Sequence, residues 1–200
     1  MEVHSLFPTP VGSFPLSKLS RDKLHLLLQQ PKKTNEGNRT SSNRAILEIA
    51  EFKRFKNEIT ECLKQYSNTV IQHPTACQLY ITQSWCNYTS KGEYHHIHHH
   101  PNSIVSGVYY IQTDNTDQIE FYKSICMEEP ITINPVSFNE FNSASWWLPA
   151  KQSMLFLFPS RLKHSVNKRT HDGPDRVSLS FNTFYKGQVG KQNDSTLLEL

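Results

Sequence analysis

The sequence has no long hydrophobic run, and its apolar stretches are short, such as MLFLF at 154–158. A membrane-spanning helix needs about 20 consecutive, mainly apolar residues, so no transmembrane segment is expected. The first residues, MEVHSLFPTP, also lack the basic start and apolar stretch of a secretion signal. Both absences predict a cytoplasmic protein.

Cysteine pairs and strong net charge are also missing. No two cysteines form a CxxC pair, so without a secretion signal we expect reduced core thiols. The cysteines are Cys62, Cys77, Cys86 and Cys126. The net charge of +3 is small and its basic residues are scattered, which argues against nucleic acid as a partner. With 36% hydrophobic and 20% charged residues, the 200-residue chain is expected to form one globular domain, residues 1–200.

The first part of the domain, residues 1–73, is expected to be helical. A short amphipathic helix is predicted over 19–30, and the polar segment 32–42 is expected to be an exposed loop. A long helix is predicted from about Arg44 to Val70, because apolar residues recur every three or four positions. These are Ile49, Phe52, Phe55, Ile59, Cys62 or Leu63, Tyr66 and Val70. Such a stripe indicates a helix face packed on a sheet.

Short β-rich runs dominate residues 74–186, separated by breaks such as TSKG, DNTD and THDGPD. The runs are QLYITQSWCNY, SIVSGVYYIQT, QIEFYK, MLFLF and RVSLSFNTF. Roughly eight strands follow the helices without alternating with them, which favours an antiparallel sandwich or barrel with helices covering one sheet. The polar residues 187–200 are expected to form a loose tail.

The last strand, 176–184, has two faces of opposite character. Arg176, Ser178, Ser180 and Asn182 share one face, while Val177, Leu179, Phe181 and Phe184 mostly populate the other. A polar inner face is unusual for a core strand. We therefore expect its inner side to line a wet pocket and its outer side to meet the helices.

Histidine is concentrated in GEYHHIHHHPN, where five imidazoles fall within positions 95–100. His98 and His100 are two residues apart, so a strand would aim both at one point. His164, in FPSRLKHSV, is the candidate third ligand. Three ligands on one side of a metal leave its other positions open for substrate and oxygen. The remaining histidines are expected to be bystanders or to support the ligands; they are His95, His96 and His99.

Arg176 follows His164 by twelve residues and shares a strand face with Ser178. A buried cation must be paired, and arginine binds a carboxylate through two parallel hydrogen bonds. Two partners remain open: a protein carboxylate in a structural salt bridge, or the carboxylate of a bound keto acid. The position just after the distal histidine favours the keto acid.

Together these residues resemble the 2-oxoglutarate/Fe(II)-dependent oxygenases, in which HxD or HxE precedes a distal His and then an Arg. YTSKGEYHHIHHHPN is similar to the metal-binding stretch of prolyl-hydroxylase-like members, and SGVYYIQT is similar to the strand that follows it there. A closer similarity, carried by LFPTPV, HHHPNSIVSGVYYI, LFPSRLKHSV and RVSLSFN, is to a small subfamily of marine bacteria and their phages. The resemblance runs from Leu6 to about Tyr185.

The resemblance implies a mainly β fold with N-terminal helices: a double-stranded β-helix, or jelly-roll, barrel with helices packed on its major sheet. It implies a dioxygenase that uses Fe(II), 2-oxoglutarate and O₂, with ascorbate as an optional reductant. Such an enzyme hydroxylates a C–H bond and releases succinate and CO₂. The metal ligands and catalytic residues would be His98, His100 and His164. The 2-oxoglutarate contacts would be Arg176, Tyr110 and Ser178.

One departure from the family pattern concerns charge. His100 stands where the general family has Asp or Glu, and the nearest preceding acid is Glu93. Three neutral imidazoles leave the Fe(II) charge to be neutralised by a 2-oxoglutarate dianion, whereas a carboxylate ligand would make the same complex negative. Binding by His98 and His164 alone also stays open, as does a different strand register with Glu93 as ligand.

Two other interpretations remain. One is a cupin: the spacing of Gly92, five residues and then HxH matches the start of the cupin sequence motif, and three histidine ligands are usual in cupins. Residues 101–106, however, lack the glutamate that a cupin has there, and a cupin does not require Arg176. The second alternative is a phage protein that kept the fold without activity.

The substrate is indicated only by analogy. The prolyl-hydroxylase-like stretch favours a peptide or protein side chain, with a free amino acid or other small metabolite as runner-up. The segment 131–148, with Trp146 and Trp147, is expected to form a lid or substrate wall, and two ordinary buried tryptophans are the alternative. Neither a membrane nor nucleic acid is expected as a partner.

Overall fold

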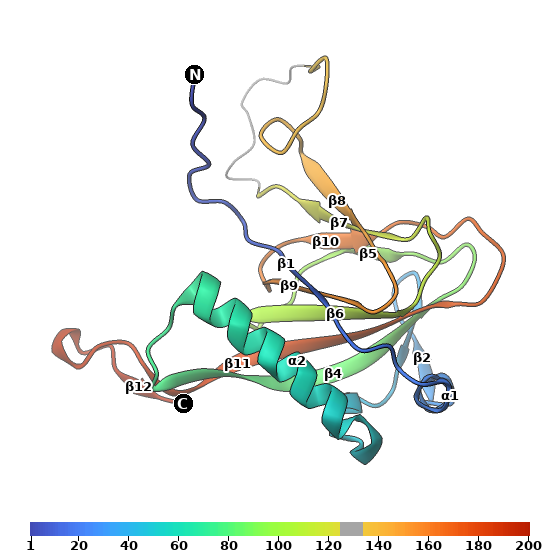
Figure 1. Ribbon diagram of the computed structural model, residues 1–200, viewed down its shortest axis with the longest axis horizontal. Coiled ribbons are helices and arrows are strands. Elements are labelled where there is room, and N and C mark those ends of the chain that lie inside the picture. Colours follow the sequence, from blue (N-terminus) through green and yellow to red (C-terminus); the bar gives the residue numbers. More distant parts are fainter. Residues whose placement is uncertain (125–133) are drawn as a thin grey trace.

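A computed structural model describes residues 1–124 and 134–200 of the chain (Figure 1). Its helices are α1 (Arg21–Leu28) and α2 (Lys53–Tyr66), with 3-10 turns at Ile46–Glu48, Ala50–Phe52 and Gln192–Asp194 and a π-helical turn at Ser67–Ile71. Its strands are β1 (Gly12–Pro15), β2 (Lys32–Thr34), β3 (Arg39–Ser41), β4 (Cys77–Thr89), β5 (His95–His98), β6 (Val105–Gln112), β7 (Gln118–Tyr122), β8 (Ser145–Pro149), β9 (Met154–Pro159), β10 (His164–Val166), β11 (Arg176–Val189) and β12 (Leu198–Glu199).

Two antiparallel sheets face each other. The major sheet has the order β1-β9-β6-β11-β4-β3-β2, with β12 added to β11, and the minor sheet has the order β5-β10-β7-β8. Along the chain, β4, β6, β9 and β11 enter the major sheet, while β5, β7, β8 and β10 enter the minor one. This order is that of a double-stranded β-helix, so the expected fold class is confirmed.

Helix α2 lies across the outer face of the major sheet (Figure 1). The predicted apolar stripe is buried there at Phe52, Phe55, Ile59, Leu63 and Tyr66. These side chains join one hydrophobic core with the outward residues of the major sheet. Burial of this stripe, rather than helix propensity, stabilises the helix.

The predicted start of the long helix at Arg44 is wrong, because α2 begins at Lys53. Ala45 forms a bridge with Ser84 of β4, and the Leu47 amide donates to the Ser84 hydroxyl at 2.9 Å. Ile46 and Leu47 are fully buried. The chain therefore runs along the sheet in 3-10 turns before α2 begins. At the far end of the predicted stripe, Val70 is exposed.

The expected loop at 32–42 is also wrong, because β2 and β3 form a hairpin that extends the major sheet. Arg39 and Thr40 pair with Tyr88 and Asn87 of β4. The Ser41 hydroxyl accepts a hydrogen bond from the Cys86 amide at 3.0 Å. Edge strands bury little apolar surface, so a polar composition gave no strand signal here.

The chain end pairs with the barrel instead of forming a loose tail. Strand β11 runs to Val189, and β12 returns to pair with Gln188 and Val189. Gly187 and Leu200 exchange both backbone hydrogen bonds, at 2.8 and 3.0 Å. This pairing rests on backbone groups, which a polar sequence does not reveal.

The two faces of β11 divide as predicted. Val177, Leu179 and Phe181 are fully buried in the core beneath α2, whereas Ser178 and Ser180 line a pocket between the sheets. A bulge between Asn182 and Thr183 shifts the alternation beyond it.

Cys62, Cys77 and Cys86 are free thiols, and Cys126 lies outside the described residues. Within residues 1–124 and 134–200, no helix is long and apolar enough to cross a membrane.

Candidate metal centre

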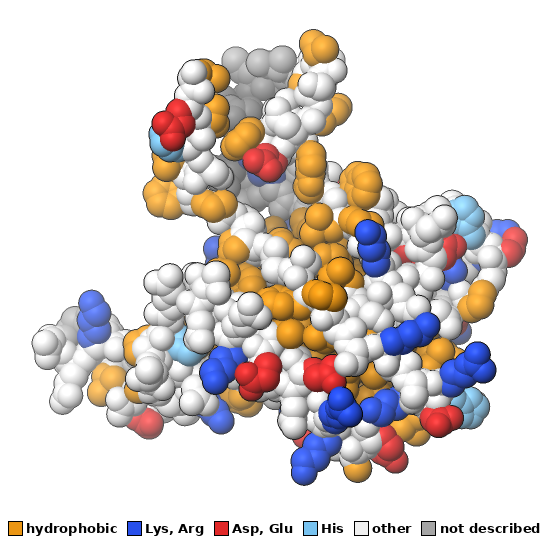
Figure 2. All heavy atoms as spheres, viewed as in Figure 1, with side chains coloured by type: hydrophobic (Ala, Val, Ile, Leu, Met, Phe, Trp, Pro, Cys, Tyr) orange, Lys and Arg blue, Asp and Glu red, His pale blue; other side chains and the backbone are white. Residues whose placement is uncertain are grey.

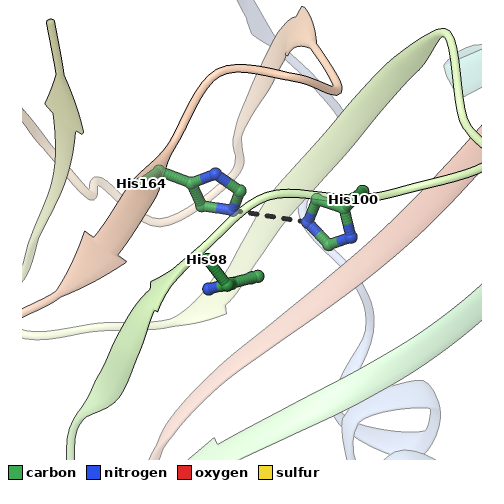
Figure 3. Close-up of side chains that lie close together, drawn as sticks. All are labelled: His98, His100 and His164. Carbon is green, nitrogen blue, oxygen red and sulfur yellow. Dashed lines mark hydrogen bonds between the residues drawn. The ribbon is translucent and has the colours of Figure 1, made fainter. Parts of the chain in front are cut away.

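Three imidazoles converge between the sheets, at the end of β5 and the start of β10. His98 and His164 are directly paired across these two strands, and His100 follows β5 with its amide donating to the Ser160 carbonyl at 2.9 Å. The candidate ligand nitrogens of His98, His100 and His164 all lie within 4.8 Å of one another (Figure 3). In the part of the chain that the structure describes, this is the one such group of possible metal ligands.

Backbone carbonyls fix the orientation of two of these rings. His98 Nδ1 lies 2.8 Å from the His96 carbonyl, and His164 Nδ1 lies 3.0 Å from the Leu162 carbonyl. Because a carbonyl oxygen can only accept, each Nδ1 must carry the proton in the neutral ring. Each Nε2 is then unprotonated, which is the tautomer that binds a metal, held by the outer hydrogen bond usual for metal-binding histidines.

The spacing of the two closest nitrogens suits a shared ion. His100 Nε2 and His164 Nε2 are 3.3 Å apart (Figure 3). Two imidazole nitrogens that each lie about 2.1 Å from one ion are separated by roughly 3 Å. The residues present therefore fit a metal bound by three histidines.

Burial keeps these imidazoles neutral. It lowers the pKa of His98, and it lowers the pKa of His100 to about 3, with neighbouring histidines adding to both effects. The pKa of His164 is likewise well below its usual value because of burial and the adjacent His98 and His100. At neutral pH the rings thus offer lone pairs without competition from protons.

These pKa shifts predict acid sensitivity of the metal-free protein. Above pH 6.5 the rings are neutral in both states, but below it the unfolded chain binds protons that the folded protein does not. The stability of the chelator-treated protein should therefore fall as the pH decreases from about 6.5 toward the His100 pKa of about 3. The measurement is the thermal unfolding midpoint at pH 7.0 and 5.5, where most carboxylates remain ionised. A His100→Asn variant should lose less stability over this range, and an unchanged wild-type midpoint would contradict the prediction.

The other histidines and the nearby acid lie outside this group. His96 contacts the Glu36 carbonyl through Nδ1 at 3.2 Å, and His99 is exposed. His95 stacks on His98 with ring centroids 4.3 Å apart and lines the same pocket, so it belongs to the immediate surroundings. Glu93 instead pairs with Arg39 at 3.3 Å and accepts a hydrogen bond from the Ser90 amide.

A narrow pocket, partly open to solvent, adjoins the three histidines. It is lined by Asn87, His95, His98, His100, Gly107, Val108, Tyr110, Ile119, Phe158, His164, Val166, Ser178 and Ser180. None of these lining residues is an acid, a lysine or an arginine. The pocket therefore combines metal ligands with neutral polar and apolar walls.

The Tyr110 hydroxyl is a polar group without a partner inside this pocket. It is fully buried and makes no hydrogen bond among the described residues. Burial raises the pKa of Tyr110, so the hydroxyl keeps its proton and is available as a donor. An unsatisfied buried hydroxyl costs about 1–3 kcal/mol, which a ligand oxygen would offset.

Ser178 lies beside Tyr110 because β11 pairs with β6 at these two residues. On its other side Ser178 pairs with Asn87 of β4, whose amide donates to the Ser180 hydroxyl at 2.9 Å. Trp85 in turn donates to Asn87 at 3.2 Å. Ser180 was expected on the pocket side of β11, whereas Asn87 was missed from sequence, because only the strand register brings it to the pocket.

Arg176 is buried and paired with a protein acid. Its Nη1 donates to Asp117 at 2.9 Å, and the two side chains are 5% and 4% exposed. Asp117 also accepts a hydrogen bond from the Asp114 amide at 2.9 Å. Arg176 lies near Tyr110, whose pKa it lowers in opposition to burial, but it does not line the pocket itself. Asp117 lies in the DNTD break, where nothing in the sequence marks it as the partner of Arg176.

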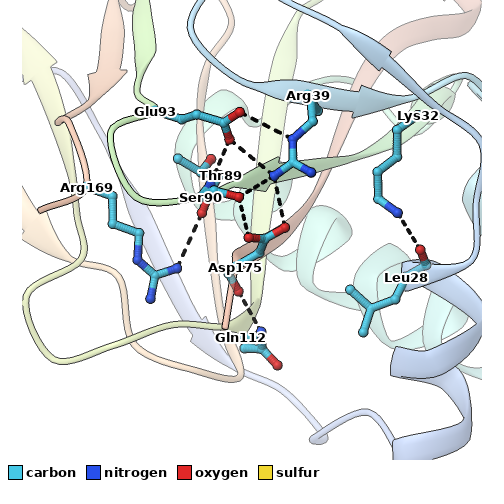
Figure 4. Close-up of polar contacts among 9 residues, drawn as sticks. All are labelled: Leu28, Lys32, Arg39, Thr89, Ser90, Glu93, Gln112, Arg169 and Asp175. Atoms are coloured by element: carbon cyan, nitrogen blue, oxygen red, sulfur yellow. Dashed lines mark hydrogen bonds and ion pairs between the residues drawn. The ribbon is translucent and has the colours of Figure 1, made fainter. Parts of the chain in front are cut away.

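A second polar network fixes the start of β11 (Figure 4). Arg39 Nη2 donates to Asp175 at 3.0 Å, and Gln112 donates to the Asp175 carbonyl at 2.6 Å. The Arg169 Nη1 donates to the Thr89 carbonyl at 3.3 Å. These contacts join β4, β6 and β11 at the point where Arg176 enters the barrel.

Known proteins resemble the chain in sequence and in fold. A family model described as "Putative 2OG-Fe(II) oxygenase" matches residues 83–182, which is half of the chain. The match includes His98, His100, His164 and Arg176. No curated protein sequence matches the chain.

Similar solved structures share the fold at low identity. The carbocyclase SnoK from nogalamycin biosynthesis, described as non-heme and alpha-ketoglutarate dependent, has a TM-score of 0.60 and 10% identity, covering 92% of this chain and 84% of SnoK. HygX from Streptomyces hygroscopicus, with nickel, 2-oxoglutarate and hygromycin B bound, has a TM-score of 0.58 and 11% identity, covering 88% and 82%. The epimerase SnoN from the same biosynthesis as SnoK has a TM-score of 0.59 and 12% identity, covering 83% and 71%.

The family match covers the strands that carry the three histidines, and the solved structures confirm the barrel. The chain belongs to the 2OG-Fe(II) oxygenase family.

Proposed function

We propose that this protein is an Fe(II)- and 2-oxoglutarate-dependent dioxygenase that hydroxylates a C–H bond of its substrate. One observation carries the proposal: three neutral imidazoles and a buried, unpartnered Tyr110 hydroxyl face the same pocket. The first group fits a metal and the second fits an anionic oxygen beside it. Family membership supplies the identity of the two ligands.

Fe(II) would be held by Nε2 of His98 and His164 and by His100. The absence of a carboxylate ligand is balanced elsewhere, because Asp117 pairs with Arg176. In the general family pattern the negative charge of the ligand carboxylate offsets the positive charge of the arginine. Here the negative charge of Asp117 offsets the positive charge of Arg176. The net charge around Fe(II) is therefore unchanged, and a 2-oxoglutarate dianion would still neutralise it.

The far carboxylate of 2-oxoglutarate would accept hydrogen bonds from Tyr110 and Ser178, which are neighbours across β6 and β11. The positive charge of Arg176, which lies near Tyr110, would also attract this carboxylate. Its contact with Asp117 uses one of its five N–H donors, which leaves others for the cosubstrate. Asp117 thus sets the position of Arg176 in this proposal.

When bound, Fe(II) and 2-oxoglutarate supply the oxidation: O₂ converts 2-oxoglutarate to succinate and CO₂ while one oxygen atom enters the substrate C–H bond. The residues of this chain bind, orient and shield these groups. Apolar side chains of the pocket, such as Val108 and Phe158, exclude water from the metal. The carbonyl contacts of His98 and His164 hold the ligand tautomer throughout.

The substrate is proposed to be a peptide or protein side chain, with an amino-acid-like metabolite as the alternative. HygX is described with hygromycin B bound and SnoN with nogalamycin RO bound, and SnoK and SnoN are a carbocyclase and an epimerase. The same barrel therefore accepts small molecules and supports outcomes other than hydroxylation. The decisive assay must consequently follow 2-oxoglutarate rather than one product.

The test is formation of succinate from 2-oxoglutarate by the purified protein with Fe(II), ascorbate and O₂. We expect turnover that requires Fe(II) and is lost in a His164→Ala variant, whereas a His99→Ala variant should retain it. Stimulation by a peptide library, and not by a pool of free amino acids, would support the peptide substrate. No succinate under any condition would instead favour a cupin-like metal protein or a phage protein without activity.

A further inference from the structure

We infer that Trp146 is the platform on which the substrate lies, and that the substrate presents an uncharged, flat ring to the metal. The inference rests on the proposed function for the identity of the site. It rests on the strand register, however, for the role of Trp146.

The register places Trp146 in one row with two metal ligands. His164 pairs with His98 on one side and with Phe121 on the other, and Phe121 pairs with Trp146. Directly paired residues of antiparallel strands project to the same side of a sheet. The row His98, His164, Phe121 and Trp146 therefore shares the inner face of the minor sheet.

Neighbouring positions confirm which face this is. Ile119, two residues before Phe121, lines the metal pocket, and its partner Leu148 packs on the core between the sheets. Adjacent strands are about 4.8 Å apart, so the Trp146 Cα lies about 10 Å from that of His164. This distance is suited to the far end of a substrate whose near end reaches the metal.

Trp147 projects from the opposite face. Its partner Glu120 accepts hydrogen bonds from Ser145 at 2.6 Å and from Tyr122 at 3.1 Å, and Tyr122 also contacts Ser165. These polar contacts mark the outer face of the minor sheet. Trp146 and Trp147 are similarly exposed, at 48% and 56%, so the face and not the exposure distinguishes them. This makes Trp147 a matched control.

The chemistry of the inner face defines the ligand. Phe121 lies between His164 and Trp146 in this row, and the next inward pair along the same two strands is Ile119 and Leu148. No charged residue lines the adjoining metal pocket. A charged substrate group would be desolvated there without a counter-ion. An exposed indole, in contrast, binds a flat ring face to face or edge to face. Figure 2 shows hydrophobic side chains gathered along the projecting arm that β7 and β8 form and at its base.

The first experiment measures binding without turnover. Protein loaded with Zn(II) and 2-oxoglutarate is titrated with N-acetylphenylalaninamide, and with the acyclic N-acetylleucinamide and zwitterionic phenylalanine as comparisons. The indole N–H signals of its three tryptophans are followed by NMR. We expect the ring amide to shift the Trp146 signal and leave that of Trp147 in place, with weaker effects of the two comparison probes.

Variants test the role directly. Trp146→Ala should weaken binding of the ring amide about tenfold, which corresponds to about 1.4 kcal/mol, and Trp146→Phe should restore most of it. Trp147→Ala should bind like the wild type. A phenylalanine-centred peptide that binds more tightly than the amide would identify a peptide source, and equal binding a small molecule.

Other results would overturn the inference. These are no shift of the Trp146 signal by any ring probe, equal effects of the two alanine variants, or equal binding of ring and acyclic amides. Because no turnover is needed, a negative succinate assay with a positive Trp146 shift would refute the oxygenase proposal and not the platform.

Discussion

Replacing His98 or His164 by alanine is expected to abolish stoichiometric binding of Fe(II), or of Ni(II) or Zn(II) as surrogates. Loss of an outer partner of a metal ligand already costs about 10–100-fold in affinity, so loss of a ligand should cost about 100-fold or more. Both rings have their Nε2 free because Nδ1 donates to a carbonyl. The measurement is metal content after dialysis, together with calorimetric titration.

The histidine cluster supplies its own controls. His96→Ala and His99→Ala should keep one metal per chain, because neither ring belongs to the converging group. His100→Ala should also lose affinity, since its Nε2 lies 3.3 Å from that of His164. Metal loss in the His96 or His99 variants, with retention in the His98 variant, would contradict the ligand set.

The second large effect concerns 2-oxoglutarate. Removing one partner of a buried charge pair costs about 2–5 kcal/mol, so Arg176→Ala should weaken 2-oxoglutarate binding about 30-fold to several thousand-fold. The wild type should bind 2-oxoglutarate more tightly than pyruvate, because pyruvate has no far carboxylate. Calorimetry on the Ni(II)-loaded protein measures both ligands.

The Asp117 contact requires a second variant. Arg176→Ala alone leaves the buried Asp117 carboxylate without its cation, which could unfold the protein. The double variant Arg176→Met/Asp117→Asn removes both charges, so it should fold and still lose the preference for 2-oxoglutarate. Asp117→Asn alone should tighten 2-oxoglutarate binding, because the amide oxygen can still accept the hydrogen bond that positions Arg176 but no longer neutralises its charge. Equal binding of pyruvate and 2-oxoglutarate by the wild type would remove the argument for Arg176.

Most of the barrel could be predicted from sequence because its strands are short β-rich runs separated by turn-forming breaks. The buried faces of β11 and α2 could be predicted because the spacing of apolar residues within each element identifies the face that is buried. The strands β1, β2, β3 and β12 were missed because backbone pairing at a sheet edge leaves no hydrophobic pattern. The start of α2 was missed because Leu47 is held by Ser84, a contact between distant segments.

The residues of the candidate site also divide into those that the sequence identified and those that only the structure reveals. His98, His100 and His164 were identified by residue type and spacing, and the structure brings them together. Asp117 could not be assigned from sequence, and Trp146, expected with Trp147 to form a lid or substrate wall, could not be distinguished from Trp147, since both distinctions depend on strand register. Asp117 lies in the turn before β7 and from there pairs with Arg176 of β11. Trp146 faces inward because it pairs with Phe121. The segment 131–148 was expected to form one wall, and its residues 131–133 lie outside the described residues.

Anomalous diffraction from crystals of the Ni(II)-loaded protein grown with 2-oxoglutarate tests the central claim most directly. We predict one strong metal peak bound by Nε2 of His98, His100 and His164, with 2-oxoglutarate chelating it and its far carboxylate against Tyr110 and Arg176. A peak bound by His95, His96 or His99 in place of these ligands, or a metal without 2-oxoglutarate in the pocket, would contradict the account.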